Sequence, residues 1–169
     1  MWKKIDPKQI EKNVFSLIGD QWMLVTAGKG EDCNTMTASW GGLGVLWGKC
    51  CATAYIRPQR YTKEFVDREP LYTLCFFSEE HKKALGYLGR NSGRDGNKVA
   101  AAGLTPVFGD GYTYFSEADL VLVCRKLYRA PVIEAGFLDK ALMDDCYPNR
   151  DFHDMYIGEI TKEIGRAHV

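Results

Sequence analysis

The amino-acid sequence predicts a mainly β domain with short helices, built on a closed or nearly closed antiparallel sheet, a β-barrel of the α+β class. Six or more short apolar runs have the length of strands, and glycine or polar turns separate them. The helical segments between them are few and short, which favours helices outside a barrel. The first four runs are too close together for parallel crossover connections, which need about a dozen residues.

The first half of the chain supplies most of these strands. Partly helical spacing of apolar residues predicts a helix within residues 7–18. Strands are expected at 22–27, 35–40, 45–47 and 51–56, and the glycines of 41–44 are expected to interrupt the sheet. A short helix at 61–68 precedes a strand at 71–77.

The second half contains more helix. Ser78 as N-cap and an acidic first turn predict a helix at 81–88. A turn cluster at 91–96 leads into a helical piece at 97–102, and an aromatic, glycine-rich segment predicts a hairpin at 108–114. A long strand at 118–127, a short helix at 138–146 and a last strand at 155–160 complete the chain.

Length and charge set limits on the function. The 169 residues carry 22 basic and 22 acidic side chains, and this length favours a single domain over 1–169. A neutral balance argues against a general polyanion-binding surface, so no nucleic acid partner is expected. No apolar run approaches the roughly 20 residues that cross a bilayer, and the start lacks a signal-peptide core. We therefore expect a cytoplasmic protein with no membrane partner.

The cysteine pattern predicts reduced thiols and no metal site. No Cys-x-x-Cys is present, and no His lies at zinc-ligand spacing from a Cys pair. A free cysteine in a strand packs as a small hydrophobic side chain. The six cysteines are Cys33, Cys50, Cys51, Cys75, Cys124 and Cys146.

Residues 34–41 concentrate four small polar side chains, a Met and a Trp. Apolar groups can cover the face of a flat heteroaromatic ring while short polar groups and backbone N–H groups read its rim. A polar strand end with its Trp in the core is an equally good interpretation of the chemistry alone. The candidate ring-binding residues are Asn34, Thr35, Met36, Thr37, Ala38, Ser39 and Trp40.

Two arginines and a lysine fall where the strand 51–56 gives way to the helix 61–68. A helix N-terminus favours an anion, and the arginine fork matches phosphate oxygens. A solvated basic turn is the alternative. The candidate anion-binding residues are Arg57, Pro58, Gln59, Arg60, Tyr61 and Thr62.

Two further features complete the candidate site. Residues 92–98 can form a glycine-rich loop over a ligand, with Lys98 closing on a phosphate, although Gly-Arg-Asp-Gly is also common turn chemistry. No Walker or Gly-x-Gly-x-x-Gly spacing occurs. His153 precedes the last predicted strand, where it can donate to a ligand or shuttle a proton, or simply lie on the surface beside acidic neighbours.

The ordered set of these segments resembles the flavin reductase-like family, and most of all its flavoredoxin branch. The resemblance runs from about residue 12 to residue 162. It is carried by residues 34–41, residues 57–62, the loop 92–95 with Lys98, and His153 ahead of 156–160.

The resemblance implies an FMN-binding split barrel, an antiparallel barrel of Greek-key type. It also implies a homodimer with FMN held non-covalently near the interface. Residues 34–39 would contact the isoalloxazine ring and the nearby ribityl chain, with Trp40 beside them. Residues 57–62 would hold the ribityl and phosphate end, and Lys98 the phosphate or ring edge. His153 would lie close to the flavin, as the candidate catalytic residue.

The function implied by the resemblance is that of an FMN-dependent oxidoreductase using NAD(P)H, which is an enzyme of the flavin reductase kind. One alternative is an electron-transfer protein like flavoredoxin, with a protein redox partner. Another is a non-catalytic FMN-binding sensor. FMN would supply the redox chemistry while the protein positions and tunes it. A donor from Thr35 or Thr37 would stabilise the reduced flavin.

Overall fold

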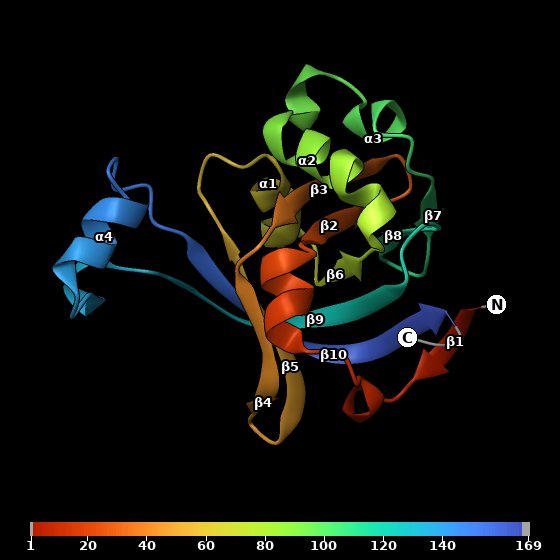
Figure 1. Ribbon diagram of the computed structural model, residues 1–169, viewed down its shortest axis with the longest axis horizontal. Helices are drawn as coiled ribbons and strands as arrows, with labels where there is room; N and C mark the ends of the chain where they lie inside the picture. Colours follow the sequence, from red (N-terminus) through yellow and green to blue (C-terminus); the bar gives the residue numbers. More distant parts are fainter. Residues whose placement is uncertain (1, 167–169) are drawn as a thin grey trace.

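The computed structural model describes residues 2–166, and the side chains of residues 6–165. Eight strands form one antiparallel sheet in the order β3-β2-β6-β9-β10-β5-β4, and β1 pairs with β10 (Figure 1). The strands are β1 (Trp2–Ile5), β2 (Met23–Lys29), β3 (Asp32–Ala38), β4 (Gly41–Leu46), β5 (Lys49–Ile56), β6 (Leu71–Phe76), β9 (Leu120–Pro131) and β10 (Asp154–Arg166). A separate hairpin consists of β7 (Pro106–Phe108) and β8 (Thr113–Phe115). The predicted mainly β class with short helices is confirmed.

The helices gather at one end of the sheet, with one exception. Figure 1 shows α1, α2 and α3 near β2 and β3, whereas α4 projects away on a segment that we call the arm, residues 132–153 between β9 and β10. The helices are α1 (Thr62–Arg68), α2 (Lys82–Arg90), α3 (Lys98–Ala101) and α4 (Lys140–Cys146). Single turns of 3-10 or π type lie at Pro7–Gln9, Ser16–Asp20, Glu79–His81, Gly93–Asp95 and Glu134–Gly136.

Three expectations about the strands are corrected. The glycines of 41–44 do not interrupt the sheet, because they belong to β4, an edge strand whose one partner among the described strands is β5. At Gly41 a Cβ would lie 2.8 Å from the Thr53 carbonyl oxygen, so this position of the strand admits no side chain. The last strand continues past residue 160 to Arg166, and β1 was not predicted at all. The second half of β10 pairs with β1 and with β9. Contacts between segments far apart in the sequence therefore define both β1 and the end of β10.

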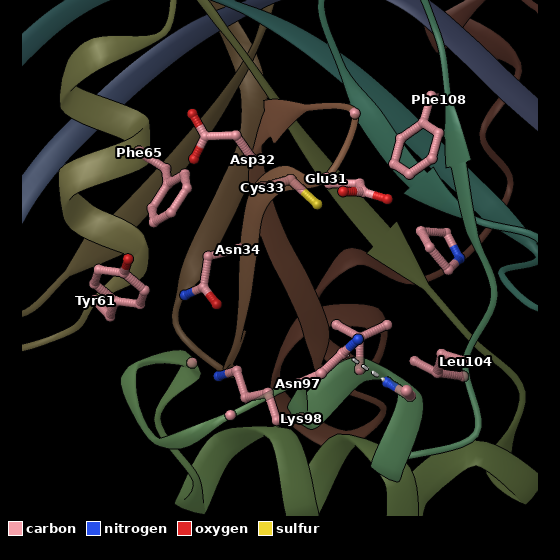
Figure 2. Close-up of a pocket in the computed structure, with 16 residues that line it drawn as sticks. Glu31, Asp32, Cys33, Asn34, Tyr61, Phe65, Asn97, Lys98, Leu104 and Phe108 are labelled. Carbon is pink, nitrogen blue, oxygen red and sulfur yellow. Dashed lines mark hydrogen bonds between the residues drawn. The ribbon is translucent and has the colours of Figure 1, made fainter.

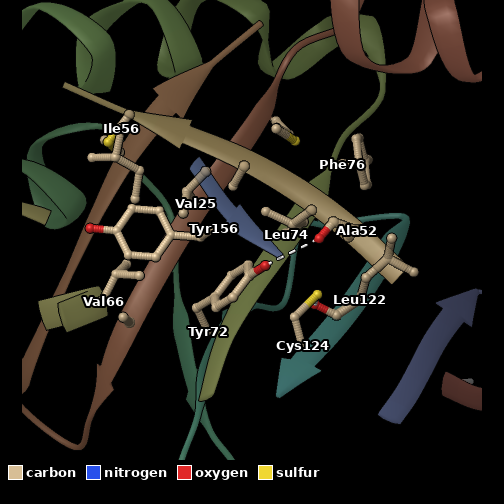
Figure 3. Close-up of a cluster of buried hydrophobic side chains, with 14 of the residues drawn as sticks. Val25, Ala52, Ile56, Val66, Tyr72, Leu74, Phe76, Leu122, Cys124 and Tyr156 are labelled. Atoms are coloured by element: carbon tan, nitrogen blue, oxygen red, sulfur yellow. Dashed lines mark hydrogen bonds between the residues drawn. The ribbon is translucent and has the colours of Figure 1, made fainter. Parts of the chain in front are cut away.

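Both faces of the central strands are buried, which explains their continuous apolar runs. Val25, Leu74 and Leu122 point into one cluster, where Tyr72 and Tyr156 are also buried (Figure 3). Their chain neighbours point the other way, because successive strand side chains alternate between faces. Beneath α2 and the β7–β8 hairpin, the second cluster contains Leu24, Cys75, Leu85, Leu88, Phe115 and Val121.

The cysteines and the helices bear on two of the expectations. All six cysteines are free thiols. Burial was expected for all of them; Cys51, Cys75 and Cys124 are buried, whereas Cys33, Cys50 and Cys146 are only partly buried. Burial raises the pKa of the Cys75 thiol to about 12, so it stays protonated.

Within residues 2–166, none of the helices has the length and apolar character needed to cross a membrane.

Close packing in the barrel interior depends on Gly158 in β10. The pairing of β10 with β9 shifts register next to this residue. A Cβ at Gly158 would lie 2.6 Å from the Tyr72 hydroxyl oxygen and 2.9 Å from Cys124 Cβ. Tyr72 is fully buried and donates to the Ala52 carbonyl at 3.4 Å, so it has little freedom to move.

Replacing Gly158 with alanine is therefore expected to destabilise the fold by about 1–3 kcal/mol, the usual range for overpacking a core. Urea unfolding followed by circular dichroism measures the change. Gly44→Ala in β4 is the matched control, because a Cβ there meets nothing within 4 Å, and its stability should stay within about 0.5 kcal/mol of wild type. Equal stability of the two variants would contradict this account of the packing.

Candidate functional site

A shallow cavity of about 200 Å³, which we call the strand-end cavity, lies where β3 ends and β10 begins. Eight of its nine lining residues are among those predicted from the sequence. The lining consists of Met36, Thr37, Ala38, Ser39, Trp40, Tyr55, Arg57, Arg60 and His153. Folding thus places the small polar strand, the basic turn and the candidate histidine at one position.

Aromatic rings form one wall of the strand-end cavity. The Trp40 ring centroid lies 5.1 Å from that of His153, and the Tyr55 ring centroid lies 6.4 Å from that of His153. Trp40 is 46% exposed. It therefore does not lie in the core, where the alternative interpretation of residues 34–41 would place it. An exposed indole beside short polar groups offers the apolar face and polar rim that a flat heteroaromatic ring requires.

His153 is buried and held by Tyr147 from the arm. The Tyr147 hydroxyl lies 2.7 Å from His153 Nδ1. Burial, helped by the nearby Arg57 charge, lowers the pKa of His153 to about 4, so the ring is neutral at pH 7. In a neutral imidazole one nitrogen donates and the other accepts. If the tyrosine hydroxyl donates to Nδ1, Nε2 carries the proton and is available as a donor.

The two threonines of β3 differ in what they can offer. Thr37 lines the strand-end cavity, and its hydroxyl donates to the Leu85 carbonyl of α2 at 2.6 Å. Thr35 is fully buried, its hydroxyl 2.8 Å from that of Thr26 and 3.3 Å from the Val25 carbonyl. The Thr35 side chain therefore faces β2, and only its backbone is left to contact a ligand.

A second, smaller cavity of about 120 Å³, the cation pocket, adjoins the first through Arg60, which lines both. Lys98 is a buried residue, and its ammonium donates to the carbonyls of Leu88 at 3.0 Å and Asn91 at 2.9 Å. Arg60 donates to the Gly89 carbonyl at 3.0 Å. The lining comprises Asn34, Gln59, Arg60, Tyr61, Thr62, Gly89, Arg90, Asn91, Ser92 and Lys98.

The cation pocket concentrates positive charge without a carboxylate to balance it. Among the described residues, neither Arg60 nor Lys98 forms an ion pair. Burial, together with the nearby Arg60 charge, lowers the pKa of Lys98 to about 8. Burial also lowers the pKa of Arg60. A bound anion would relieve both effects, and charge-assisted N–H donors suit phosphate oxygens.

Arg57 has a different environment from Arg60. It pairs with Asp151 at 2.7 Å, donates to the Cys146 carbonyl at 2.9 Å and lies over the Tyr147 ring at 4.9 Å. Gln59 also donates to Asp151, at 2.8 Å. The hydrogen bonds from Gln59 and Arg57 lower the pKa of Asp151. Arg57 therefore ties the arm to the barrel, and its charge is paired with that of Asp151.

The remaining predicted residues have mixed placements. Asn34 lines the cation pocket and donates to the Thr62 hydroxyl at 2.8 Å. Pro58 is exposed in the turn and contributes to neither cavity. Within residues 2–166, no group of three His, Cys, Asp or Glu side chains is placed to hold a metal ion.

Sequence reasoning missed two aromatic residues of the site. Tyr147 lies on the arm, six positions before His153, and no motif marks it. Tyr55 stands in β5 immediately before the basic turn, and strand alternation could have placed it on the same face as Arg57. The carbonyls that hold Arg60 and Lys98 carry no signal in a sequence, because every residue has one.

A family model for the flavin reductase like domain matches residues 15–164 of the chain. The chain belongs to this family. No curated protein matches it by sequence.

Solved structures in the flavin reductase-like family share its fold. A flavoredoxin from Methanosarcina acetivorans is 19% identical, with a TM-score of 0.68, over 97% of this chain and 76% of its own. The flavoredoxin of Desulfovibrio vulgaris is also 19% identical, with a TM-score of 0.68 over 96% and 77%. An NADH:FAD oxidoreductase from Streptomyces globisporus, solved with NAD and FAD fragments, is 15% identical, with a TM-score of 0.65 over 86% and 74%.

The low pKa of His153 predicts a pH dependence of stability. The ordinary value is about 6.5 in an unfolded chain, against about 4 in the folded protein. Between these values the unfolded chain binds the extra proton, so the free energy of unfolding should rise as pH increases from 4 to 6.5. Urea unfolding at several pH values and an NMR titration of the His153 ring measure this. A ring midpoint near 6.5, or an unchanged slope in His153→Gln, would contradict it.

Proposed function

We propose that this chain binds FMN without a covalent bond, with the ring in the strand-end cavity and the phosphate in the cation pocket. The observation that carries the proposal is the pair of cations formed by buried Lys98 and half-buried Arg60, whose partners among the described residues are backbone carbonyls and no carboxylate. They lie next to an aromatic-walled cavity that Arg60 also lines. A ligand with a flat ring and a phosphate group matches the strand-end cavity with its ring and the cation pocket with its phosphate.

The backbone of the loop before α3 supports this assignment. A Cβ at Gly93 would lie 2.1 Å from the Asn34 amide oxygen, so the loop can approach β3 this closely only with a glycine. Ser92 and Asn91 line the cation pocket from the same loop. Short side chains and close backbone give a phosphate several donors within reach.

The chain's own residues would then hold and tune the flavin. FMN when bound supplies a two-electron redox centre, a chemistry that side chains do not provide. Trp40 covers part of the proposed ring site. Thr37 lies at the polar edge of that site, where its hydrogen bond to the Leu85 carbonyl holds β3 against α2. His153, neutral and fixed by Tyr147, offers one donor or acceptor nitrogen to the same cavity.

The activity we propose is flavin reduction by NAD(P)H, which makes the chain an oxidoreductase. The NADH:FAD oxidoreductase among its structural relatives supports this, and the flavoredoxins among them support electron transfer with a redox-partner protein as the second candidate. A cytoplasmic location and a homodimer remain part of the proposal. For the dimer, the arm offers the exposed apolar side chains Ile133, Leu138 and Leu142.

Arg60→Ala should raise the Kd for FMN by about tenfold or more, because charge-assisted hydrogen bonds to a phosphate contribute about 1.5–3 kcal/mol each. A fluorescence-quench titration with FMN measures this. Arg125→Ala is the matched control, since Arg125 is an exposed arginine of β9 paired with Glu159. Unchanged FMN affinity in Arg60→Ala would contradict the placement of the phosphate in the cation pocket.

Anaerobic mixing with excess NADH or NADPH should bleach the visible absorbance of the FMN-loaded protein. His153→Ala should slow this reaction while leaving FMN bound, and His81→Ala, outside both cavities, should react as wild type does. Stopped-flow absorbance measures the rates. Bleaching by a ferredoxin-like donor but by neither pyridine nucleotide would favour the flavoredoxin-like candidate, and bleaching by none would leave a flavin-binding sensor.

A further inference from the structure

The arm brings one hydroxyl group to the candidate histidine, that of Tyr147. It lies 2.7 Å from His153 Nδ1, and the hydroxyl makes no other hydrogen bond within the described residues. Tyr147 is only 6% exposed, so water has little access to replace a missing partner. The direction of this one hydrogen bond therefore decides which nitrogen of His153 carries the proton.

Two arguments make the Tyr147 hydroxyl the donor. If His153 Nδ1 donated instead, the hydroxyl proton would have no acceptor among the described residues, and an unpaired buried polar group is costly. A phenol is also a stronger acid than a neutral imidazole, which favours the O–H···N arrangement. Burial raises the pKa of Tyr147, so the hydroxyl keeps its proton at pH 7. Nδ1 therefore accepts, and Nε2 carries the N–H of the neutral ring.

The two nitrogens of His153 have different surroundings. Tyr147 does not line the strand-end cavity but a neighbouring apolar cavity, which shares Ser39, Trp40 and Tyr55 with it. Because Nδ1 is bonded to Tyr147, the strand-end cavity, which His153 lines, is left to the other edge of the ring. Nε2 has no hydrogen-bond partner in the described part of the chain, so its N–H is available to a ligand.

The ring of Tyr147 is held by contacts that do not need its hydroxyl. The Arg57 guanidinium lies over the ring at 4.9 Å and donates to the adjacent Cys146 carbonyl at 2.9 Å. The ring centroids of Phe152 and Phe137 lie 5.0 Å and 5.8 Å from that of Tyr147. Removing the hydroxyl alone therefore deletes the bond to His153 and leaves the packing of the arm in place.

We propose that Tyr147 is a positioning residue, whose hydroxyl fixes the His153 tautomer so that Nε2–H donates to the rim of a flavin ring in the strand-end cavity. This inference rests on the proposed flavin site and deepens it. The phosphate end of that site is the cation pocket, where Lys98 extends beneath Asn34 (Figure 2), so the ring end lies on the side of His153. A fixed donor at the rim stabilises the negative charge that the ring gains on reduction.

Long-range ¹H–¹⁵N NMR of the full chain at pH 7, without added flavin, tests the tautomer. In wild type, Nε2 of His153 should show the shift of a protonated nitrogen and Nδ1 that of an acceptor, and His153→Gln assigns the signals. Tyr147→Phe should replace this pattern by the average of both tautomers. Tyr128→Phe is the matched control, because Tyr128 is an exposed tyrosine of β9 that lines neither cavity, and it should keep the wild-type pattern.

The FMN-loaded protein gives a second measurement. In Tyr147→Phe the flavin potential, titrated against a reference dye, should become more negative while FMN affinity stays unchanged. Reduction by NADH should slow by roughly two- to tenfold, the range that one neutral hydrogen bond accounts for. Tyr128→Phe should equal wild type in both. His153→Gln, whose amide reaches the Nε2 position, should retain more of the rate than His153→Asn, whose amide ends near Nδ1.

The outcomes separate this inference from the proposed function. An Nδ1–H tautomer in wild type, or the wild-type pattern in Tyr147→Phe, overturns the positioning role. A changed tautomer with an unchanged flavin potential overturns the donation from Nε2 to the flavin. Failure of wild type to bind FMN overturns the proposed function, and the tautomer, measured without flavin, still decides the role of Tyr147 toward His153.

Discussion

The C-terminal end of α2 holds the two cations on which the candidate site depends. The last carbonyls of a helix have no partner within it and carry a partial negative charge. Here the Leu88 and Gly89 carbonyls accept from Lys98 and Arg60, and the Asn91 carbonyl just beyond the helix accepts a second bond from Lys98. These contacts fix both cations in place without neutralising them, so their charge remains available to an anion.

The same helix end links three otherwise separate segments. Arg60 belongs to the turn before α1, Lys98 begins α3, and the carbonyls belong to α2. Thr37 adds a further link, from β3 to the Leu85 carbonyl. Because α2 packs on the sheet through Leu85 and Leu88, burial of an apolar surface determines where the cations lie. The hydrophobic core and the polar site are therefore coupled through one short helix.

Arg57 and Arg60 show how far sequence can assign roles within one basic turn. Both lie in the turn between β5 and α1, and from the sequence alone either could bind a phosphate. Their partners decide between them, and those partners lie elsewhere in the chain. Asp151 of the arm pairs with Arg57, whereas the Arg60 side chain donates to the Gly89 carbonyl and has no ion pair among the described residues. No spacing rule relates Asp151 to residue 57, so only folding reveals the difference.

The sequence by itself determined the mainly β class, the approximate position of the central strands and the segments that form the candidate site. It could do so because apolar runs, glycine turns and short polar motifs are local features. The tertiary structure alone decided the pairing of β1 with β10, the continuity of β4 through its glycines and the inward orientation of Thr35. Each of these depends on contacts between residues far apart in the chain, which no local pattern encodes.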